Sequence, residues 1–238
     1  MKFLVTGGRG FIGSHFVEKC LNEGHKVVDI DSMTYAANIN LPFDSDKNYQ
    51  HLKQDICKVK HLPPCDILVN FAAESHVDNS IIEPDVFAQT NIIGTQNLLN
   101  LVRGKTYNKP LFVHISTDEV YGDIYNGSFT EDSKITPSNP YSASKASAEM
   151  VLLAYARTYN ITYQICRSSN NYGARQYPEK LIPKIIECLD DNKPVPIHGD
   201  GSYIRDWTYV KDNIDGIYKT CFTDKVNQVW NISSNNCL

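Results

Sequence analysis

A glycine-rich turn near the N-terminus constrains the fold more than any other feature of the sequence. It lies between a short apolar run at residues 2–6 and a helical pattern that extends to about Gly24. Glycines spaced in this way permit a tight turn, let backbone N–H groups approach a pyrophosphate, and let the helix pack closely on its strand. The glycines and the two apolar residues among them form the predicted cofactor-binding turn: Gly7, Gly10, Phe11, Ile12 and Gly13.

A second apolar run, residues 26–30, follows the helix and ends at Asp31. At about this distance from the glycines, dinucleotide-binding folds carry an acidic residue that hydrogen-bonds the adenosine ribose diol. The same carboxylate would repel a 2′-phosphate, so the sequence favours NAD over NADP as the cofactor. Arg9, within the glycine-rich turn, is the one residue that argues for the phosphate instead.

Strand and helix patterns alternate over the rest of the chain. Apolar or β-branched runs predict strands at residues 66–71, 111–115, 161–166, 194–197 and 228–232. Helical patterns cover residues 85–103, 141–159, 177–191 and 211–221. This alternation predicts an α/β fold with a doubly wound parallel sheet, whose ligands bind beyond the carboxyl ends of the strands.

Two further stretches are predicted cofactor contacts. Residues 32–49 read as a polar loop, after which Asp55 and Ile56 close a short third strand and could meet the adenine edge. Ala72 and Ala73 follow the predicted strand at residues 66–71. Side chains as small as these let a dinucleotide lie flat against the backbone.

A polar stretch at residues 116–122 follows the predicted strand at residues 111–115. Two adjacent carboxylates at a strand end are costly to bury unless they take part in chemistry. Thr117, Asp118 and Glu119 are therefore candidate catalytic residues. A helix N-cap or a solvated turn would contain the same residue types, so this stretch alone leaves both interpretations open.

Tyr141 and Lys145 stand one turn apart on the helix predicted at residues 141–159. Beside a nicotinamide, the ammonium group of Lys145 would favour the phenolate form of Tyr141. Lowering the pKa of a tyrosine from about 10 towards 7 needs roughly 4 kcal/mol of differential stabilisation, which a close cation and the cofactor ring together could supply. The same spacing also arises by chance in many helices.

Composition excludes several classes of protein. A net charge of −4 and the absence of a basic run argue against nucleic-acid binding. No apolar run is long enough for a membrane span, and the N-terminus does not have the pattern of a signal peptide. The seven cysteines are scattered and include no Cys-x-x-Cys pair, so they predict reduced thiols, no metal site and a cytoplasmic location.

The glycine-rich turn, the Tyr141–Lys145 pair and the Asn70-Phe-Ala-Ala stretch together resemble the extended short-chain dehydrogenase/reductase superfamily. Four stretches resemble the nucleoside-diphosphate-glucose 4,6-dehydratases, of the dTDP-glucose or UDP-glucose kind: AESHVD at 73–78, STDEVYG at 116–122, SSNNYG at 168–173 and GDGSYIRDW at 199–207. The resemblance covers essentially the whole chain. The adjacent pair Asp118 and Glu119 is its most diagnostic element, since related 4-epimerases lack it and UDP-glucuronate decarboxylases usually have serine at the first position.

This resemblance implies an NAD-dependent lyase that makes a 4-keto-6-deoxy sugar nucleotide. Tyr141 would remove the proton of the glucose 4-hydroxyl, which Thr117 orients. Glu119 would take the C5 proton and Asp118 would protonate the departing 6-hydroxyl. Lys145 would hold the nicotinamide ribose and tune Tyr141. Elimination needs an acid and a base in different protonation states, and adjacent carboxylates in unequal environments can provide both.

The resemblance also implies further residues that contact the cofactor and the substrate, and a division of the chain into two parts. It places Asn91 at the cofactor, and at the substrate it places His76, Thr117, Asn170 and Arg205. A Rossmann-type NAD-binding domain is expected at 1–173 and a smaller sugar-nucleotide lobe at 174–238. This lobe is expected to be incomplete, because family members continue for several elements beyond the position of Asn236.

Partners and rival functions follow from the same features. A homodimer is expected, because the helices predicted at 85–103 and 141–159 carry apolar residues beyond one face. The expected substrate is a nucleoside-diphosphate-glucose, with no nucleic acid and no membrane as partner. A UDP-sugar 4-epimerase, a UDP-glucuronate decarboxylase and a catalytically silent NAD-binding protein are the alternatives.

Overall fold

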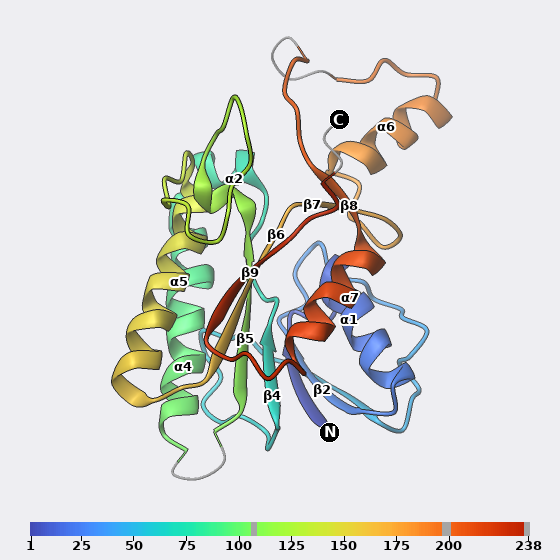
Figure 1. The fold of residues 1–238 in the computed structure, drawn as a ribbon. Helices are drawn as coiled ribbons and strands as arrows, with labels where there is room; N and C mark the ends of the chain where they lie inside the picture. Colours follow the sequence, from blue (N-terminus) through green and yellow to red (C-terminus); the bar gives the residue numbers. More distant parts are fainter. Residues whose placement is uncertain (106–108, 197–200, 236–238) are drawn as a thin grey trace.

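The computed structural model describes residues 1–105, 109–196 and 201–235, and within them seven strands form one parallel sheet (Figure 1). The order across the sheet is β3-β2-β1-β4-β5-β6-β9. Its strands are β1 (Lys2–Thr6), β2 (Lys26–Asp31), β3 (Tyr49–Lys53), β4 (Ile67–Asn70), β5 (Leu111–Thr117), β6 (Tyr163–Ser168) and β9 (Gln228–Ile232). The predicted doubly wound α/β fold is confirmed.

Helices cover both faces of the sheet, as Figure 1 shows. One face carries α1 (Phe11–Asn22) and α7 (Val210–Thr220), and the other carries α4 (Thr95–Arg103) and α5 (Pro140–Tyr159). Side chains of β1 alternate between the two layers: Phe3 and Val5 belong to the core beneath α1 and α7, whereas Leu4 belongs to the core beneath α4 and α5. Each such buried side chain stabilises the fold by about 1.5–3 kcal/mol.

The strand order reverses direction at β1, which lies between β2 and β4. Ligands of open α/β sheets bind at such a switch point, outside the carboxyl ends of the strands. That edge is the upper one in Figure 1, opposite the N-terminus. The short helices α2 (Val77–Ile82) and α3 (Pro84–Phe87) and the 3₁₀ turn η2 (Asp118–Tyr121) follow strands that end there.

The third strand is not where the sequence placed it. It covers Tyr49–Lys53 and pairs with β2, so Tyr49 belongs to a strand and not to the preceding loop. Asp55 and Ile56 lie beyond its end, where an oxygen of the Asp55 carboxylate accepts a hydrogen bond from the Cys57 amide at 2.8 Å. As an edge strand with a polar sequence, β3 lacks the apolar pattern that identifies buried strands.

The helix predicted at residues 85–103 is interrupted. Between α3 and α4 the chain forms a π-helical segment, η1 (Ala88–Gly94). A Cβ atom at Gly94 would lie 2.5 Å from Cδ1 of Ile56, so this glycine allows the helix to pack against the loop after β3. Hydrophobic periodicity does not distinguish a π-helical turn from an α-helical one, and π-bulges are frequent at functional sites.

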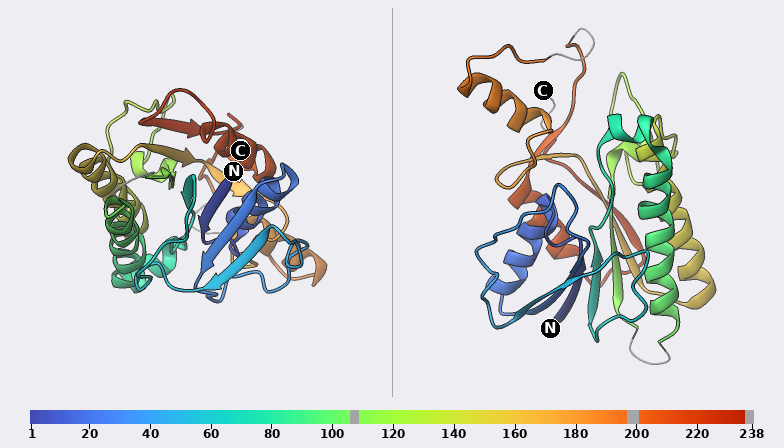
Figure 2. Two further views of the ribbon diagram at one scale, coloured as in Figure 1. Left: turned by 90° about the horizontal axis from the view of Figure 1, so that it is seen from below. Right: turned by 180° about the vertical axis from the view of Figure 1, so that it is seen from behind.

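The C-terminal part differs from the sequence-based prediction in three places. Two short strands, β7 (Asn170–Tyr172) and β8 (Trp207–Tyr209), pair with each other in a separate small sheet. Helix α6 (Leu181–Asp190) starts later than predicted and extends away from the main sheet, as the orange helix in the right-hand view of Figure 2 shows. Residues 194–196 form no strand, and Ile197 lies outside the described residues.

The last two elements return to the main sheet. Helix α7 packs on α1, and β9 pairs with β6, although both follow residue 173. These two elements of the segment 174–238 thus pack with the segment 1–173. That the first segment binds NAD and the second binds the sugar nucleotide stays a prediction. Among the helices that the structure describes, none combines the length and apolar character that a membrane crossing requires.

Candidate active site

The glycine-rich turn joins β1 to α1 at the switch point and has the form that a dinucleotide needs. Gly7 has a positive φ of 72°, and a Cβ atom there would lie 2.7 Å from the backbone nitrogen of Ala72. A Cβ atom at Gly13 would lie 2.1 Å from the carbonyl oxygen of Gly7. Gly10 is the N-cap of α1 and offers no side-chain cap, so the first amides of this helix can receive a pyrophosphate.

Asp31 ends β2 beside this turn and is only 8% exposed. Its carboxylate accepts hydrogen bonds from the amides of Arg9 at 2.9 Å and Met33 at 2.8 Å. The side chain of Arg9 points elsewhere, because it donates to the carbonyl oxygens of Asn38 (3.0 Å) and Ile39 and pairs with Asp44. The guanidinium group of Arg9 is thus held by the loop at residues 38–44, and it does not point to where a 2′-phosphate would lie beside Asp31.

Replacing Asp31 by serine should weaken NAD binding by about tenfold or more, since a charged acceptor for the ribose diol is lost. Discrimination against NADP should fall at the same time. Titrating both cofactors into wild type and variant, with Asp123→Asn on an exposed loop as the control, measures both effects. Equal affinity of the wild type for NAD and NADP would mean that Asp31 does not have this role.

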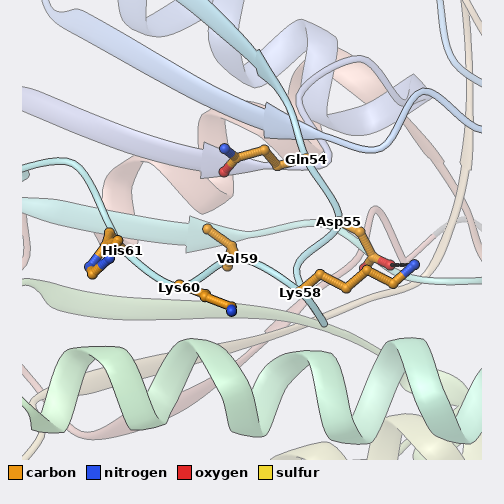
Figure 3. Close-up of a pocket in the computed structure, with 6 residues that line it drawn as sticks. All are labelled: Gln54, Asp55, Lys58, Val59, Lys60 and His61. Carbon is orange, nitrogen blue, oxygen red and sulfur yellow. Dashed lines mark ion pairs between the residues drawn. The ribbon is translucent and has the colours of Figure 1, made fainter.

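The other predicted cofactor residues differ in their burial and in their contacts. Asp55 lines a surface pocket of about 360 Å³ and pairs with Lys58 at 3.4 Å (Figure 3), whereas the side chain of Ile56 is buried in the core. Ala72 donates its amide to Oγ1 of Thr6 at 3.4 Å, which holds the Ala72–Ala73 backbone near the glycine-rich turn. All of them stay predicted contacts.

Asn91, in the π-helical segment, has its polar atoms occupied by the protein. It exchanges hydrogen bonds with the backbone of Glu74, at 2.9 Å and 3.0 Å, and donates to Oγ of Ser144 at 2.8 Å. These contacts tie the loop after β4 to helix α5. The structure therefore gives Asn91 a role in holding the loop after β4 against α5, and its predicted contact with the cofactor stays a prediction.

The candidate catalytic residues gather where β5 ends. Oγ1 of Thr117 accepts a hydrogen bond from the Glu119 amide and donates to Oδ1 of Asp118, both at 3.2 Å. Tyr141, in the first turn of α5, lies close enough for its pKa to respond to Thr117, Asp118 and Glu119, and α5 contacts the 3₁₀ turn. Asn139, the N-cap of α5, donates to Oε2 of Glu119 at 3.1 Å. Four of the five predicted catalytic residues therefore form one cluster.

The two adjacent carboxyl groups differ in environment. Burial, followed by the negative charge of Glu119, raises the pKa of Asp118 to about 6, against the opposing hydrogen bond from Thr117. Asp206, beside β8, adds a further negative charge that acts in the same direction. Asp118 thus holds its proton to a higher pH than an ordinary aspartate does, as a general acid requires.

Lys145 is not among the groups that shift the pKa of Tyr141 in the structure, so the expectation that it favours the phenolate beside a nicotinamide stays a prediction. Its ammonium group donates to the carbonyl oxygen of Ile115 at 2.6 Å, and burial lowers the pKa of Lys145 to about 8. Burial and then the charge of Glu119 raise the pKa of Tyr141 instead. A phenolate at Tyr141 therefore requires positive charge that the cofactor ring would supply.

Asp118→Asn should stabilise the protein more at high pH than at low pH. An unfolded chain ionises aspartate near pH 4, below the folded-state pKa of about 6, so this carboxyl destabilises the fold as the pH rises between these values. The variant should gain about 3 kcal/mol of unfolding free energy at pH 8 and roughly half of that at pH 5. Urea denaturation at both pH values measures this, and an equal gain at both would contradict it.

The predicted substrate residues are less closely gathered. His76 is the N-cap of α2 and accepts from the Asn79 amide at 3.4 Å. Asn170 begins β7, and its amide donates to the carbonyl oxygen of Asp206 at 3.2 Å. Arg205 is exposed, with its guanidinium over the ring of Tyr203 at 5.6 Å. Within the described residues, no contact joins Arg205 to the catalytic cluster.

Lys180 is a candidate that sequence reasoning missed. Its ammonium group donates to the carbonyl oxygen of Ser75 at 3.0 Å and is close enough to Glu119 for the two charges to interact. No local pattern marks this lysine, because its partners are distant in the sequence. Asn139 was also missed, although an asparagine directly before Pro140 is a recognisable helix N-cap.

Comparisons with known proteins identify the family of the chain. The model of the GDP-mannose 4,6 dehydratase family matches residues 4–236. The low-salt glycan biosynthesis protein Agl12 of Haloferax volcanii is 43% identical over 241 residues, which cover 98% of this chain and 77% of that protein. A dTDP-glucose 4,6-dehydratase of Haemophilus influenzae is 43% identical over 257 residues, which cover 99% of this chain and 75% of that protein.

Solved structures give the same result. The dTDP-glucose 4,6-dehydratase DesIV of Streptomyces venezuelae, with NAD and TYD bound, superposes with a TM-score of 0.95 at 42% identity, covering all of this chain and 77% of that one. A UDP-glucuronic acid 4-epimerase of Bacillus cereus superposes with a TM-score of 0.92 at 31% identity and 79% coverage of that chain. The chain belongs to the GDP-mannose 4,6 dehydratase family, within the extended short-chain dehydrogenase/reductase superfamily.

Proposed function

We propose that this protein is an NAD-dependent 4,6-dehydratase, a hydro-lyase that converts a nucleoside-diphosphate-glucose to the 4-keto-6-deoxy sugar nucleotide. The observation that carries the proposal is the cluster of Thr117, Asp118, Glu119 and Tyr141, in which burial raises the pKa of the Asp118 carboxyl to about 6. The dTDP-glucose 4,6-dehydratases among the relatives and the NAD in the related crystal structures support the same reaction and cofactor.

The cofactor fits the residues of the switch point. A Cβ atom at Gly7 or Gly13 would meet the backbone of the chain itself, so this tight turn needs glycine there, and the Asp31 carboxylate lies beside the turn, where it accepts from the Arg9 amide. When bound, NAD would supply the redox chemistry: it would take hydride from C4 of the sugar and return it to C6 after water has left, with no net redox change. Gly7, Gly10, Gly13, Asp31 and the Ala72–Ala73 backbone would hold it, with Lys145 at the nicotinamide ribose.

Each residue of the cluster then has one proton to move or hold. Tyr141 accepts the proton of the 4-hydroxyl while Thr117 orients that hydroxyl. The 4-ketone acidifies the C5 proton, which Glu119 removes with Asn139 fixing its carboxylate. Asp118 donates its proton to the 6-hydroxyl, which departs as water. General acid–base steps of this kind contribute about 10²–10⁴-fold each to the rate.

Product analysis tests the proposed function. Incubation with NAD and either dTDP-glucose or UDP-glucose should give the 4-keto-6-deoxy sugar with at least one of the two nucleotides. A C4 epimer or, from UDP-glucuronate, a pentose with released carbon dioxide would instead identify the rival reactions. The relatives favour dTDP as the nucleotide.

We also propose a homodimer that pairs the layer of α4 and α5 with its counterpart. Large apolar side chains are exposed on this layer, among them Ile93 and Met150. Sedimentation velocity at micromolar concentration should show a dimer, and a monomer alone would exclude it.

A cytoplasmic location is proposed from the six described cysteines, which are all free thiols.

A further inference from the structure

Residues 177–180, here called the strap, contact the loop that follows β2. The hydroxyl of Tyr35 donates a hydrogen bond to Oε1 of Glu179 at 3.0 Å. The rings of Tyr35 and Tyr177 meet edge to face, with their centroids 5.2 Å apart. Tyr35 lies shortly after Asp31, so the strap reaches the side of the glycine-rich turn where the adenosine ribose is proposed to bind.

The opposite end of the strap contacts the loop that follows β4. Lys180 donates to the carbonyl oxygen of Ser75 at 3.0 Å. Ser75 comes shortly after Ala72 and Ala73, which face the glycine-rich turn. Lys180 also interacts with the charges of Glu119 and Asp78, so this end of the strap borders the catalytic cluster.

The sheet order places the glycine-rich turn beneath the strap. Its two anchors follow β2 and β4, which are the two neighbours of β1. Neighbouring strands lie about 4.8 Å apart, so β2 and β4 are separated by about 10 Å. Residues 177–180 form a turn, in which the Lys180 amide donates to the carbonyl oxygen of Tyr177 at 3.1 Å. The side chains of Tyr177 and Glu179 reach the loop after β2 and that of Lys180 reaches the loop after β4, so the strap bridges the two loops that flank the carboxyl end of β1.

The base of the strap is fixed to α1. Nε2 of His15 is 2.9 Å from the carbonyl oxygen of Ala174, and Arg175 donates to Oε2 of Glu18 at 2.7 Å. A ring nitrogen that faces a carbonyl oxygen must carry the proton, so His15 is the donor. Helix α1 begins at the glycine-rich turn, and the segment that leads into the strap is thus attached to the same helix.

We propose that the strap closes over NAD and controls its release, so that the Tyr35–Glu179 contact has to open before the cofactor can leave. A dinucleotide that extends from Asp31 to the Ala72–Ala73 backbone would pass between the glycine-rich turn and the strap. This inference rests on the proposed placement of NAD. It gives Tyr35 and Glu179 a function as positioning residues, outside the cluster that performs the chemistry.

The dissociation rate of NAD from the protein tests the strap. Tyr35→Phe and Glu179→Met each remove the hydrogen bond and should speed NAD release by about three- to tenfold. The double variant should release NAD no faster than the faster single variant, because both changes break one contact. Glu179→Gln keeps an acceptor and should restore slow release. Tyr125→Phe, at a tyrosine that is 98% exposed, is the matched control and should leave the rate unchanged.

Release within twofold of wild type in both single variants, or effects that multiply in the double variant, would overturn the strap. The variants should have the same thermal midpoints as the wild type, because the contact lies at the surface. Equal midpoints would show that faster NAD release does not come from a general loss of stability. A wild-type protein that binds no NAD would overturn the proposed function and the strap together. Normal NAD binding with unchanged release would overturn the strap alone.

Discussion

Replacing Arg167 by methionine is expected to lower the free energy of unfolding by about 3–5 kcal/mol. Arg167 and Glu149 form an ion pair with side-chain exposures of 4% and 0%, in which Nη2 lies 2.6 Å from Oε2 and Nε lies 3.1 Å from Oε1. The substitution leaves the carboxylate of Glu149 buried without its partner. Arg167 also donates to the hydroxyl of Tyr121 at 2.7 Å, so the turn that carries the catalytic acids loses a support.

Urea denaturation measures this loss, and two variants control it. Arg157→Met, on the exposed end of α5, should change the unfolding free energy by no more than about 0.5 kcal/mol. The double variant Glu149→Leu, Arg167→Met should recover much of the loss, since no buried charge remains unpaired. A loss below about 1 kcal/mol for Arg167→Met alone would show that the ion pair is not important for the fold.

Tyr141→Phe and Asp118→Asn should each reduce turnover by about 10²–10⁴-fold, but at different steps. Without the Tyr141 hydroxyl, no group accepts the 4-hydroxyl proton, and the bound sugar should stay unchanged. With an amide at position 118, oxidation at C4 should proceed, but no proton reaches the departing 6-hydroxyl. The Asp118→Asn enzyme should therefore accumulate the 4-keto-glucose nucleotide, which mass analysis of a single turnover detects.

Asp123→Asn, just beyond the 3₁₀ turn on an exposed loop, is the matched control and should turn over at the wild-type rate. An unchanged sugar in the Asp118→Asn enzyme would contradict the acid role. It would show that Asp118 is needed before water is lost, and a substrate-positioning role would replace the proposed one.

Local sequence was sufficient where the chemistry depends on residues close together in the chain. The glycines of the turn, Asp31 at the end of β2, and the acids after β5 were all predicted in position, because strand ends and tight turns have strong local signals. The same is true of the parallel sheet itself. Its buried strands read as apolar runs in the sequence.

The remaining features depend on contacts between distant residues. Strand β3 was misplaced because an edge strand does not need an apolar face. The short strands β7 and β8 exist only because they pair with each other across the chain. The contact of Lys180 with Ser75 and the retention of Arg9 by the loop at residues 38–44 also have no local signal.

The charge state of Tyr141 shows why spacing alone is insufficient. A lysine one helical turn away predicted a lowered pKa for this tyrosine. In the fold, the ammonium group of Lys145 is held by the carbonyl oxygen of Ile115, and burial acts on Tyr141 in the opposite direction. The direction of a pKa shift depends on which groups the ammonium and hydroxyl contact in the folded protein.

Deuterium incorporation during a single turnover tests the proposed elimination most directly. The protein, loaded with NAD, is mixed with dTDP-glucose or UDP-glucose in heavy water, and the sugar nucleotide is examined by mass spectrometry. We predict a product that has lost water and carries solvent deuterium at C5, with this label absent in Glu119→Gln. A product of unchanged composition that keeps its C5 hydrogen, as an epimer would, would contradict dehydration by this chain.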